Sequence, residues 1–466
     1  MKKTPSFVHT PQNAWERYTS ARDRKAMDSL ARRYLDFLTR CKTERETIAY
    51  VLEALQQAGY GEDAAGPLFV RQFRGKALVA ARRGTAPLDE GLHLVAAHVD
   101  SPRLDLKQRP LVEQPALVQA KTHYYGGIRK YQWLARPLAL HGVLVRQDAS
   151  CLHLSLGEEP NEPVFSIADL LPHLAADHNR QKLSEAFSAE KLNLVFGHCP
   201  DLACKKDFGD KDLLKNSILK LLHEKYGLCE EDFISAELQA VPAGAARFVG
   251  LDSALLGGYG HDDRLCVFAA LSALLKSRKP HHSSVLVLWD KEEIGSEGAT
   301  GARSRFLDYC LADLLAAWQP GLGLSSCLLR SRALSADVAP ALDPDWQELH
   351  DKHNAALLGY GPCFAKFTGA RGKYEANDAD AEYVGWLRGV LNARKIPWQM
   401  AECGKVDQGG GGTVALFLAA YGMDVIDIGP AVLGTHSPFE LASKVDLYAM
   451  QEALEAFFES SAAFQS

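Results

Sequence analysis

The fold is decided by the stretch LHLVAAHVDSP, residues 92–102. Its apolar half, residues 92–97, is short and compatible with a buried β-strand, and polar residues follow at once, beginning with His98 and Asp100. In open α/β sheets, binding and catalytic groups lie beyond the carboxyl ends of the strands. The stretch therefore predicts an α/β fold whose chemistry lies at the end of this strand.

The same arrangement recurs farther along the chain. Residues 285–289 form a second buried-strand pattern that leads into Glu292-Glu293, and residues 425–428 form a third. Helical spacing of apolar residues follows Asp262-Asp263, and the last helix is predicted to begin with Ser437 as its N-cap. Strands that alternate with helices in this way indicate a mixed sheet flanked by helices.

The region between these segments has a different pattern. Residues 138–145 and 151–156 have the pattern of antiparallel strands, and a charged helical stretch follows at residues 211–231. We expect an inserted, mainly β domain over residues 108–247 that serves dimerisation or regulation. Residues 1–107 and 248–466 would then form the catalytic domain.

The composition excludes several classes of protein. The 466 residues include 52 Lys and Arg against 58 Asp and Glu, so the net charge of −6 provides no basic surface for nucleic acid or anionic lipid. No apolar run approaches the roughly 20 residues that cross a membrane, and the N-terminal residues lack the apolar core of a signal peptide. The 10 cysteines are scattered through a large chain, unlike a disulfide framework. We therefore expect a cytoplasmic protein, and by its size an enzyme.

Acidic and imidazole side chains stand at strand ends and helix starts along the chain. Each has an ordinary structural role when taken alone: Asp262 could cap a helix, and His436 could be a loop residue. Together, two histidines and three carboxylates are the ligand set that a pair of divalent ions needs, with one carboxylate bridging the ions. A further carboxylate must accept the proton of a shared water, and neighbouring glutamates can divide these two tasks.

Five motifs occur in one order along the chain, at residues 97–102, 262–264, 290–297, 334–337 and 434–437. With these motifs, the chain resembles the metallo-aminopeptidase family of aspartyl aminopeptidase and vacuolar aminopeptidase I. The resemblance runs from the N-terminal helices to the final helix and includes the insertion. It implies an α/β metallo-aminopeptidase domain that removes N-terminal residues, with a preference for Asp or Glu, from peptides.

The resemblance also implies two divalent metal ions and a ligand for each. His98 would bind one ion and His436 the other, Asp262 would bridge them, and Glu293 and Asp337 would be terminal ligands. Zinc is the expected metal, with cobalt and manganese as alternatives, because all three accept these ligands.

Two further roles follow from the same resemblance. Glu292 is implied as the general base that activates the metal-bridged water, and Asp100 as the residue that orients His98. The family commonly has Asp-Asn where this chain has Asp262-Asp263, so either aspartate remains a candidate for the bridge.

The substrate and assembly expectations rest on three residues. Lys366 and Tyr374 fall where similar family members recognise substrate, and Lys366 would pair with an acidic side chain; a solvated lysine is the alternative. His173 resembles an inserted-domain histidine that reaches a neighbouring subunit's active site, and a structural histidine is its alternative. The resemblance thus implies peptide substrates and a homo-oligomer, a tetrahedral dodecamer.

Two other functions remain open from the sequence. Another two-metal amidohydrolase, such as a carboxypeptidase or a deacylase, would need a cationic clamp, which Arg264 or Arg371 could supply. A catalytically idle scaffold would be expected to have lost ligand residues, whereas all of them are present here.

Two further patterns do not predict a catalytic or metal site. The run Gly409-Gly410-Gly411-Gly412 lacks the ending of a P-loop and predicts a tight loop that lets backbone approach the substrate. His281-His282 follows Pro280 in a loop, which predicts a solvated pair.

Overall fold

The structure, a computed structural model, describes residues 7–208 and 211–464. The chain divides into two compact units. The first holds the described residues up to Asp100, Ala246–Thr435 and those from Glu440 onward, and the second holds Ser101–Ala245 with His436–Phe439. The expected insertion, residues 108–247, overlaps the second unit, and its task in dimerisation or regulation stays a prediction.

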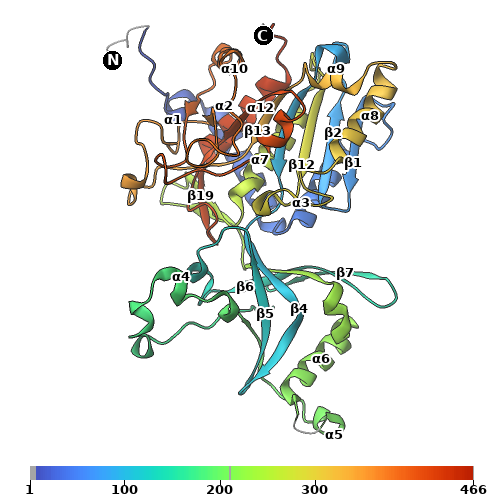
Figure 1. The fold of residues 1–466 in the computed structure, drawn as a ribbon, viewed down its shortest axis with the longest axis vertical. Coiled ribbons are helices and arrows are strands. Elements are labelled where there is room, and N and C mark those ends of the chain that lie inside the picture. The colour runs from blue at the N-terminus through green and yellow to red at the C-terminus, as the bar shows by residue number, and fades with distance from the viewer. Residues whose placement is uncertain (1–6, 209–210, 465–466) are drawn as a thin grey trace. The chain divides into compact units, whose positions relative to one another are not determined.

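The centre of the first unit is an eight-stranded mixed sheet (Figure 1), which confirms the predicted α/β class. Four neighbouring strands, β12, β3, β13 and β17, run parallel, and helices lie in the chain between them, as parallel connections require. In sheet order the strands are β1 (Leu68–Phe73), β2 (Ala77–Arg82), β12 (Ser284–Trp289), β3 (His93–His98), β13 (Arg332–Ala336), β17 (Asp424–Gly429), β15 (Cys363–Ala365) and β16 (Gln399–Met400).

Helices pack on both faces of this sheet. Successive residues of β3 alternate between two apolar cores: Val95 and Ala97 lie in one, and Leu94 and Ala96 lie in the other, as expected for a strand buried on both sides. The first core includes α2 (Ala21–Arg40), α3 (Glu44–Gln57), α7 (His261–Lys276), α10 (Ala381–Ala393) and α12 (Lys444–Phe458), and the second includes α8 (Phe306–Trp318), α9 (Leu324–Leu328) and α11 (Ala415–Ala419).

The predicted start of the last helix at Ser437 is wrong. Helix α12 begins at Lys444 and has Ser443 at its N-cap. The preceding residues form a strand, β19 (Glu440–Ser443), because they pair with β11 (Leu255–Gly258) in a smaller sheet. That sheet has the order β10 (Arg247–Val249), β11, β19, β18 (Ala431–Leu433) and β14 (Ala339–Pro340).

The second unit is built on a six-stranded antiparallel sheet. The two strands predicted over residues 138–145 and 151–156 are confirmed as neighbours in it, and the charged stretch contains helix α6 (Leu213–Tyr226). The sheet order is β7 (Cys151–Leu156), β6 (Leu138–Val145), β9 (Glu237–Pro242), β4 (Arg103–Gln114), β5 (Leu117–Tyr125) and β8 (Leu194–Gly197).

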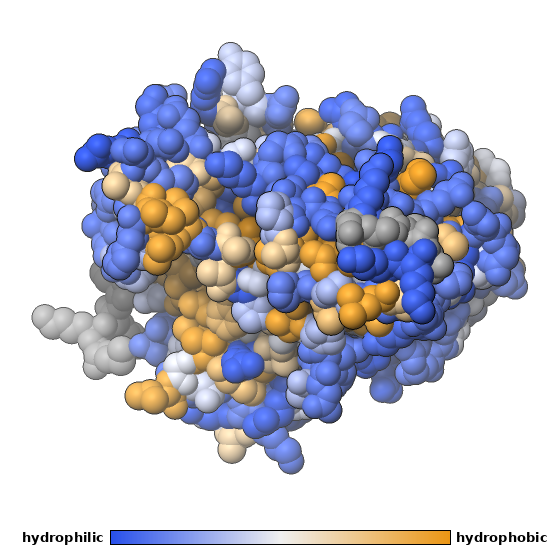
Figure 2. All heavy atoms as spheres, turned by 90° about the horizontal axis from the view of Figure 1, so that it is seen from below, coloured by the Kyte–Doolittle hydropathy of each residue, from blue (hydrophilic) through white to orange (hydrophobic). Residues whose placement is uncertain are grey.

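The surface is mainly hydrophilic with scattered apolar patches on the face that Figure 2 shows. In the second unit, exposed large apolar side chains gather in one part of the sequence: Val164, Leu170, Leu171, Leu174 and Leu183. Among the helices of residues 7–208 and 211–464, none has the length and the apolar character that a membrane span requires.

Candidate metal centre

Three neighbouring parallel strands bring polar residues to one edge of the main sheet. Strand β3 ends at His98, opposite Trp289 at the end of β12, and β13 lies on its other side. Glu292 and Glu293 follow β12 in a 3-10 helix, η7 (Glu292–Ile294), and Asp337 follows β13 directly. The parallel register therefore places these side chains at the same edge, as the strand-end pattern predicted.

The imidazole of His98 is the centre of this cluster. It is 1% exposed, and its Nδ1 lies 3.0 Å from the backbone oxygen of Asp100 and 3.4 Å from the carboxylate of that residue. On the other side of the ring, Nε2 lies 3.1 Å from Asp262 Oδ1 and 4.0 Å from oxygens of both Glu292 and Asp337. The ring is thus held by Asp100 with its Nε2 facing acids.

Asp100 also fixes the position of the two glutamates. Its Oδ1 accepts a hydrogen bond from the backbone N–H of Glu292 at 3.1 Å, and its Oδ2 accepts one from Glu293 at 3.2 Å. The side chain is fully buried. One carboxylate therefore contacts both the imidazole at the end of β3 and the first turn of η7, which makes Asp100 a positioning residue for each.

Helix α7 supplies the two aspartates at its start. The backbone N–H of Asp262 donates to Glu440 Oε2 at 3.1 Å, which ties the start of this helix to β19. Ligand atoms of His98, Asp263 and Asp337 lie within 4.8 Å of one another, and those of His98, Glu292 and Glu293 do so as well. Both aspartates therefore reach the cluster, and the geometry keeps each as a candidate for the bridge.

Two acids of this cluster, Asp337 and Asp263, have raised pKa values. Burial, followed by the charges of Asp262 and Asp263, raises the pKa of Asp337 well above its usual range. Burial also raises the pKa of Asp263, and Asp262 adds to the rise against the opposing effect of His98. Burial would lower the pKa of His98, but its hydrogen bonds with Asp100 and Asp262 raise it well above its usual range.

The raised pKa values show how well a metal ion would fit among these side chains. Carboxylates buried this close together repel one another when ionised, and a divalent cation among them offsets that repulsion. Imidazole and carboxylate are ligands that zinc and its neighbours in the first transition row accept. The residues of the first unit therefore fit a zinc-type centre.

Two of the predicted site residues lie in the second unit. His436 belongs to the short segment His436–Phe439, and its Nδ1 lies 2.9 Å from the backbone oxygen of Gly127. His173 is exposed in a 3-10 turn, η3 (Pro172–Leu174). The role of His436 as a ligand and that of His173 at a neighbour's site both stay predictions.

The predicted substrate residues occupy an exposed part of the first unit. Lys366 Nζ lies 2.7 Å from Asp378 Oδ1, and Lys373 Nζ lies 2.8 Å from Oδ2 of the same carboxylate. Tyr374 is 72% exposed. The structure therefore pairs Lys366 with an acid of the chain, and its role toward substrate stays a prediction.

The glycine run packs against this same loop. A Cβ at Gly410 would lie 1.8 Å from the backbone oxygen of Gly369, and the backbone of Gly410 has a φ of +111°. A Cβ at Gly409 would meet the backbone oxygen of Cys403 at 1.7 Å. These glycines thus permit a close approach to neighbouring backbone of the chain, and an approach of this loop to substrate stays a prediction.

Sequence reasoning missed two acids that matter here. Glu440 binds the backbone at the start of α7, and Asp378 binds two lysines. Glu440 carries a sequence signal that could have found it, since it is an acid between the apolar residues Phe439 and Leu441. Asp378 carries no such sequence signal, because its pairing with Lys366 and Lys373 depends on the path of an irregular loop.

Comparison with known proteins identifies relatives along nearly the whole chain. The family model described as aminopeptidase I zinc metalloprotease (M18) matches residues 37–458. A probable M18 family aminopeptidase 1 of Thermotoga maritima is 45% identical over 457 residues, which cover 96% of this chain and 98% of the relative. The predicted family resemblance is thereby confirmed.

Solved structures agree in fold. The crystal structure of aminopeptidase I from Clostridium acetobutylicum superposes with a TM-score of 0.92 at 40% identity, and covers 97% of this chain and 100% of its own. The Saccharomyces cerevisiae mApe1 dodecamer superposes with a TM-score of 0.74 at 20% identity, over 93% of this chain and 97% of its own. At that identity, the second likeness shows the fold alone.

Proposed function

The chain belongs to the aminopeptidase I zinc metalloprotease (M18) family, and it is therefore a metallo-aminopeptidase that hydrolyses the N-terminal bond of peptides. We propose that it does so with two divalent ions. The observation that carries this proposal is the group of buried and half-buried acids around His98 at the edge of the main sheet. The proposed ligands are His98, Asp262, Glu293, Asp337 and His436.

The assignment of the bridge to Asp262 has one support in the geometry. Its Oδ1 lies 3.1 Å from His98 Nε2, which is about the spacing of two neighbouring ligand atoms on one zinc ion with bonds of 2.0–2.1 Å. Asp263 remains the reserve candidate, since it also lies beside His98. Zinc is the proposed metal, with cobalt and manganese as alternatives.

The ions would supply Lewis-acid polarisation of the scissile carbonyl and a lowered pKa for the attacking water. Glu292 accepts the proton of that water and then gives it to the leaving amine. Asp100 keeps this general base in place through the backbone N–H of Glu292 and keeps His98 turned toward the acids. Binding of the free substrate amine at neighbouring carboxylates would restrict cleavage to N-termini.

We further propose that Lys366 recognises an acidic first residue, with Tyr374 beside it. The pair that Lys366 makes with Asp378 is exposed, since the two side chains are 40% and 46% exposed. Exposed ion pairs contribute little free energy, so an acidic substrate side chain can replace Asp378 at low cost. Lys373 then still holds Asp378.

A substrate panel tests these proposals together. The enzyme is stripped with a chelator, restored with zinc, cobalt or manganese, and offered Asp, Glu, Ala and Leu substrates with free or blocked amines. We expect two ions per chain at the centre around His98, and cleavage of free-amine substrates only. Cleavage of blocked substrates would favour a deacylase instead, and a single ion per chain would overturn the two-metal centre.

Variants of the lysine pair test the acidic preference. Lys366→Ala should lower kcat/KM for Asp and Glu substrates by about 10–100-fold relative to Ala substrates, the range for a lost hydrogen bond to a charged group. Asp378→Asn is the matched control, because it keeps Lys366 and should leave the preference intact. Equal loss on all substrates in Lys366→Ala would contradict the specificity role.

We also propose a cytoplasmic homo-oligomer, a dodecamer in which His173 completes a neighbouring active site. Two observations support assembly: the exposed apolar side chains of the second unit, and the fold shared with a protein solved as a dodecamer. Light scattering gives the number of subunits directly, and a fully active monomer would rule out the role of His173.

A further inference from the structure

A second cluster of metal-binding residues lies at the opposite ends of the strands that carry the candidate centre. His281 and His282 lie just before β12, separated from it by Ser283, and Glu90 ends a 3-10 helix, η1 (Leu88–Glu90), that precedes β3. A strand of 6 residues is about 20 Å long, so this cluster is separate from the acids around His98. Nothing in the proposed mechanism uses it.

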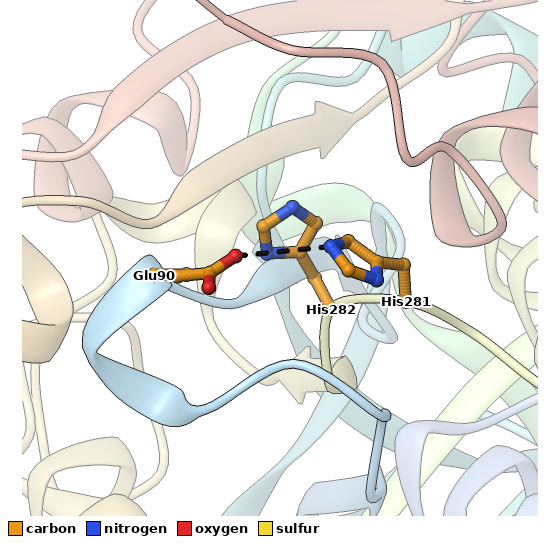
Figure 3. Close-up of side chains that lie close together, drawn as sticks. All are labelled: Glu90, His281 and His282. Carbon is orange, nitrogen blue, oxygen red and sulfur yellow. Dashed lines mark ion pairs between the residues drawn. The ribbon is translucent and has the colours of Figure 1, made fainter.

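The three side chains converge with a spacing close to that of a shared ion (Figure 3). Their ligand atoms lie within 4.8 Å of one another, and His281 Nε2 lies 3.7 Å from Glu90 Oε2. Tetrahedral zinc with bonds of 2.0–2.1 Å spaces its ligand atoms about 3.4 Å apart. Small side-chain rotations therefore suffice to bring all three ligand atoms to one ion.

The histidine pair is less solvated than its sequence predicts. His282 is only 7% exposed, so the expectation of a solvated pair is wrong for this residue. Its ring packs against the ring of buried His93, with centroids 4.4 Å apart, and its Nδ1 lies 3.3 Å from the backbone oxygen of Gly91. The buried ring is thus held in place, while His281 and Glu90 remain about half exposed and open to an arriving ion.

Backbone hydrogen bonds hold the two segments together before any ion binds. The N–H of Ala86 donates to the oxygen of His281 at 2.8 Å, and the N–H of His93 donates to the oxygen of Ser283 at 3.0 Å. The ligands are therefore carried on backbone that is already paired, which lowers the ordering cost of binding. The positive charge of Arg332 acts on His282 and opposes a cation, so the carboxylate of Glu90 is needed to balance it.

We propose that Glu90, His281 and His282 form a metal site of their own, which takes one divalent transition ion and joins the segments that lead into β3 and β12. Two imidazoles with one carboxylate suit zinc, nickel and copper, whereas magnesium and calcium prefer oxygen ligands alone. The ion would stabilise the folded chain without taking part in hydrolysis.

The test counts ions in the whole protein. Wild type, Glu90→Gln and His281→Ala are stripped, dialysed against micromolar zinc, and analysed for zinc per chain by mass spectrometry and for peptidase turnover. Both variants should hold one ion fewer per chain than wild type, and their peptidase turnover should equal that of wild type. His353→Ala, which removes an exposed histidine elsewhere in the first unit, is the matched control and should keep the wild-type count.

Thermal unfolding gives a second readout. Zinc binding at this site should raise the unfolding midpoint of wild type by about 3–4 °C beyond the rise in Glu90→Gln, since a ligand that binds the folded state stabilises it. Equal zinc counts in wild type and both variants would overturn the proposal. If the variants lost turnover together with the ion, that ion would belong to the catalytic centre. This result would overturn the proposal as well.

Discussion

The two ends of β3 and β12 carry opposite kinds of cluster. At the carboxyl ends, buried and half-buried acids surround the imidazole of His98, whereas at the amino ends two imidazoles meet one carboxylate, that of Glu90. The first arrangement concentrates negative charge where water is excluded, which is costly unless a cation balances it. The second arrangement contains only one carboxylate, and its pair with His281 is exposed to solvent. We therefore expect a metal to offset charge repulsion at one end and to be an addition at the other.

The means of positioning differ in the same way. At the carboxyl ends, a buried side chain, Asp100, holds both the imidazole and the glutamates. At the amino ends, paired backbone holds the ligands, and the side chains of Glu90 and His281 remain exposed. Substitutions of side chains should consequently have large effects at the first end and small effects at the second.

The glutamate pair offers the sharpest test of the acid-rich end. Glu292→Gln should lower turnover by about 10²–10⁴-fold, the contribution of a positioned general acid–base group, and should keep the metal content of wild type. Glu293→Gln should lose metal, because it removes a proposed ligand charge. Metal analysis and kcat on the same samples separate the two roles.

The outcome can contradict the division of labour in two ways. Equal loss of metal in both variants would show that both glutamates are ligands. Full activity in both would remove the catalytic role of the pair altogether.

A smaller effect is expected at Asp100. Asp100→Asn replaces an acceptor that serves two backbone N–H groups with an amide that can accept at only one end. We expect a loss of about 10–100-fold in metal affinity or activity, the usual effect of removing a partner that orients a metal ligand. Titration with zinc gives the affinity, and a variant that binds and turns over like wild type would refute the positioning role.

The comparison also shows which features the sequence could predict. Strand ends are local patterns, and a parallel register carries them to one edge, so the meeting of His98 and Glu292 followed from the strand pattern. The strand before Asp337 was not predicted, and this residue entered the site through the family resemblance. Asp100 and its imidazole partner are two positions apart, and that contact was likewise within reach of the sequence.

Features that depend on distant partners escaped prediction. Ser437 has the pattern of a helix start, but pairing with β11 turned the next residues into a strand. His282 follows a proline in a loop, and its burial against His93 arises only when two segments far apart in sequence meet. The pairing of Lys366 with Asp378 likewise depends on the path of an irregular loop.

A buried acid outside both clusters tests whether burial alone produces a measurable pH effect. Asp446, at the start of α12, accepts hydrogen bonds from the backbone N–H groups of Gly359 at 2.6 Å and Gly361 at 2.8 Å. Burial raises the pKa of this carboxyl to about 7, and the two donors limit the rise. It thus resembles Asp100 at the carboxyl ends, which is also buried and also accepts two backbone hydrogen bonds.

The sign of the effect follows from proton linkage. The unfolded chain releases this proton near pH 4 and the folded chain near pH 7, so the folded state binds more protons between these values and stability falls as the pH rises. Between pH 6 and pH 7 this group should lower the free energy of unfolding by about 1 kcal/mol. Asp446→Asn should remove that difference, whereas Asp345→Asn, at an exposed aspartate, should not. Urea unfolding at both pH values measures it, and an unchanged difference in Asp446→Asn would show that burial here does not hold the proton.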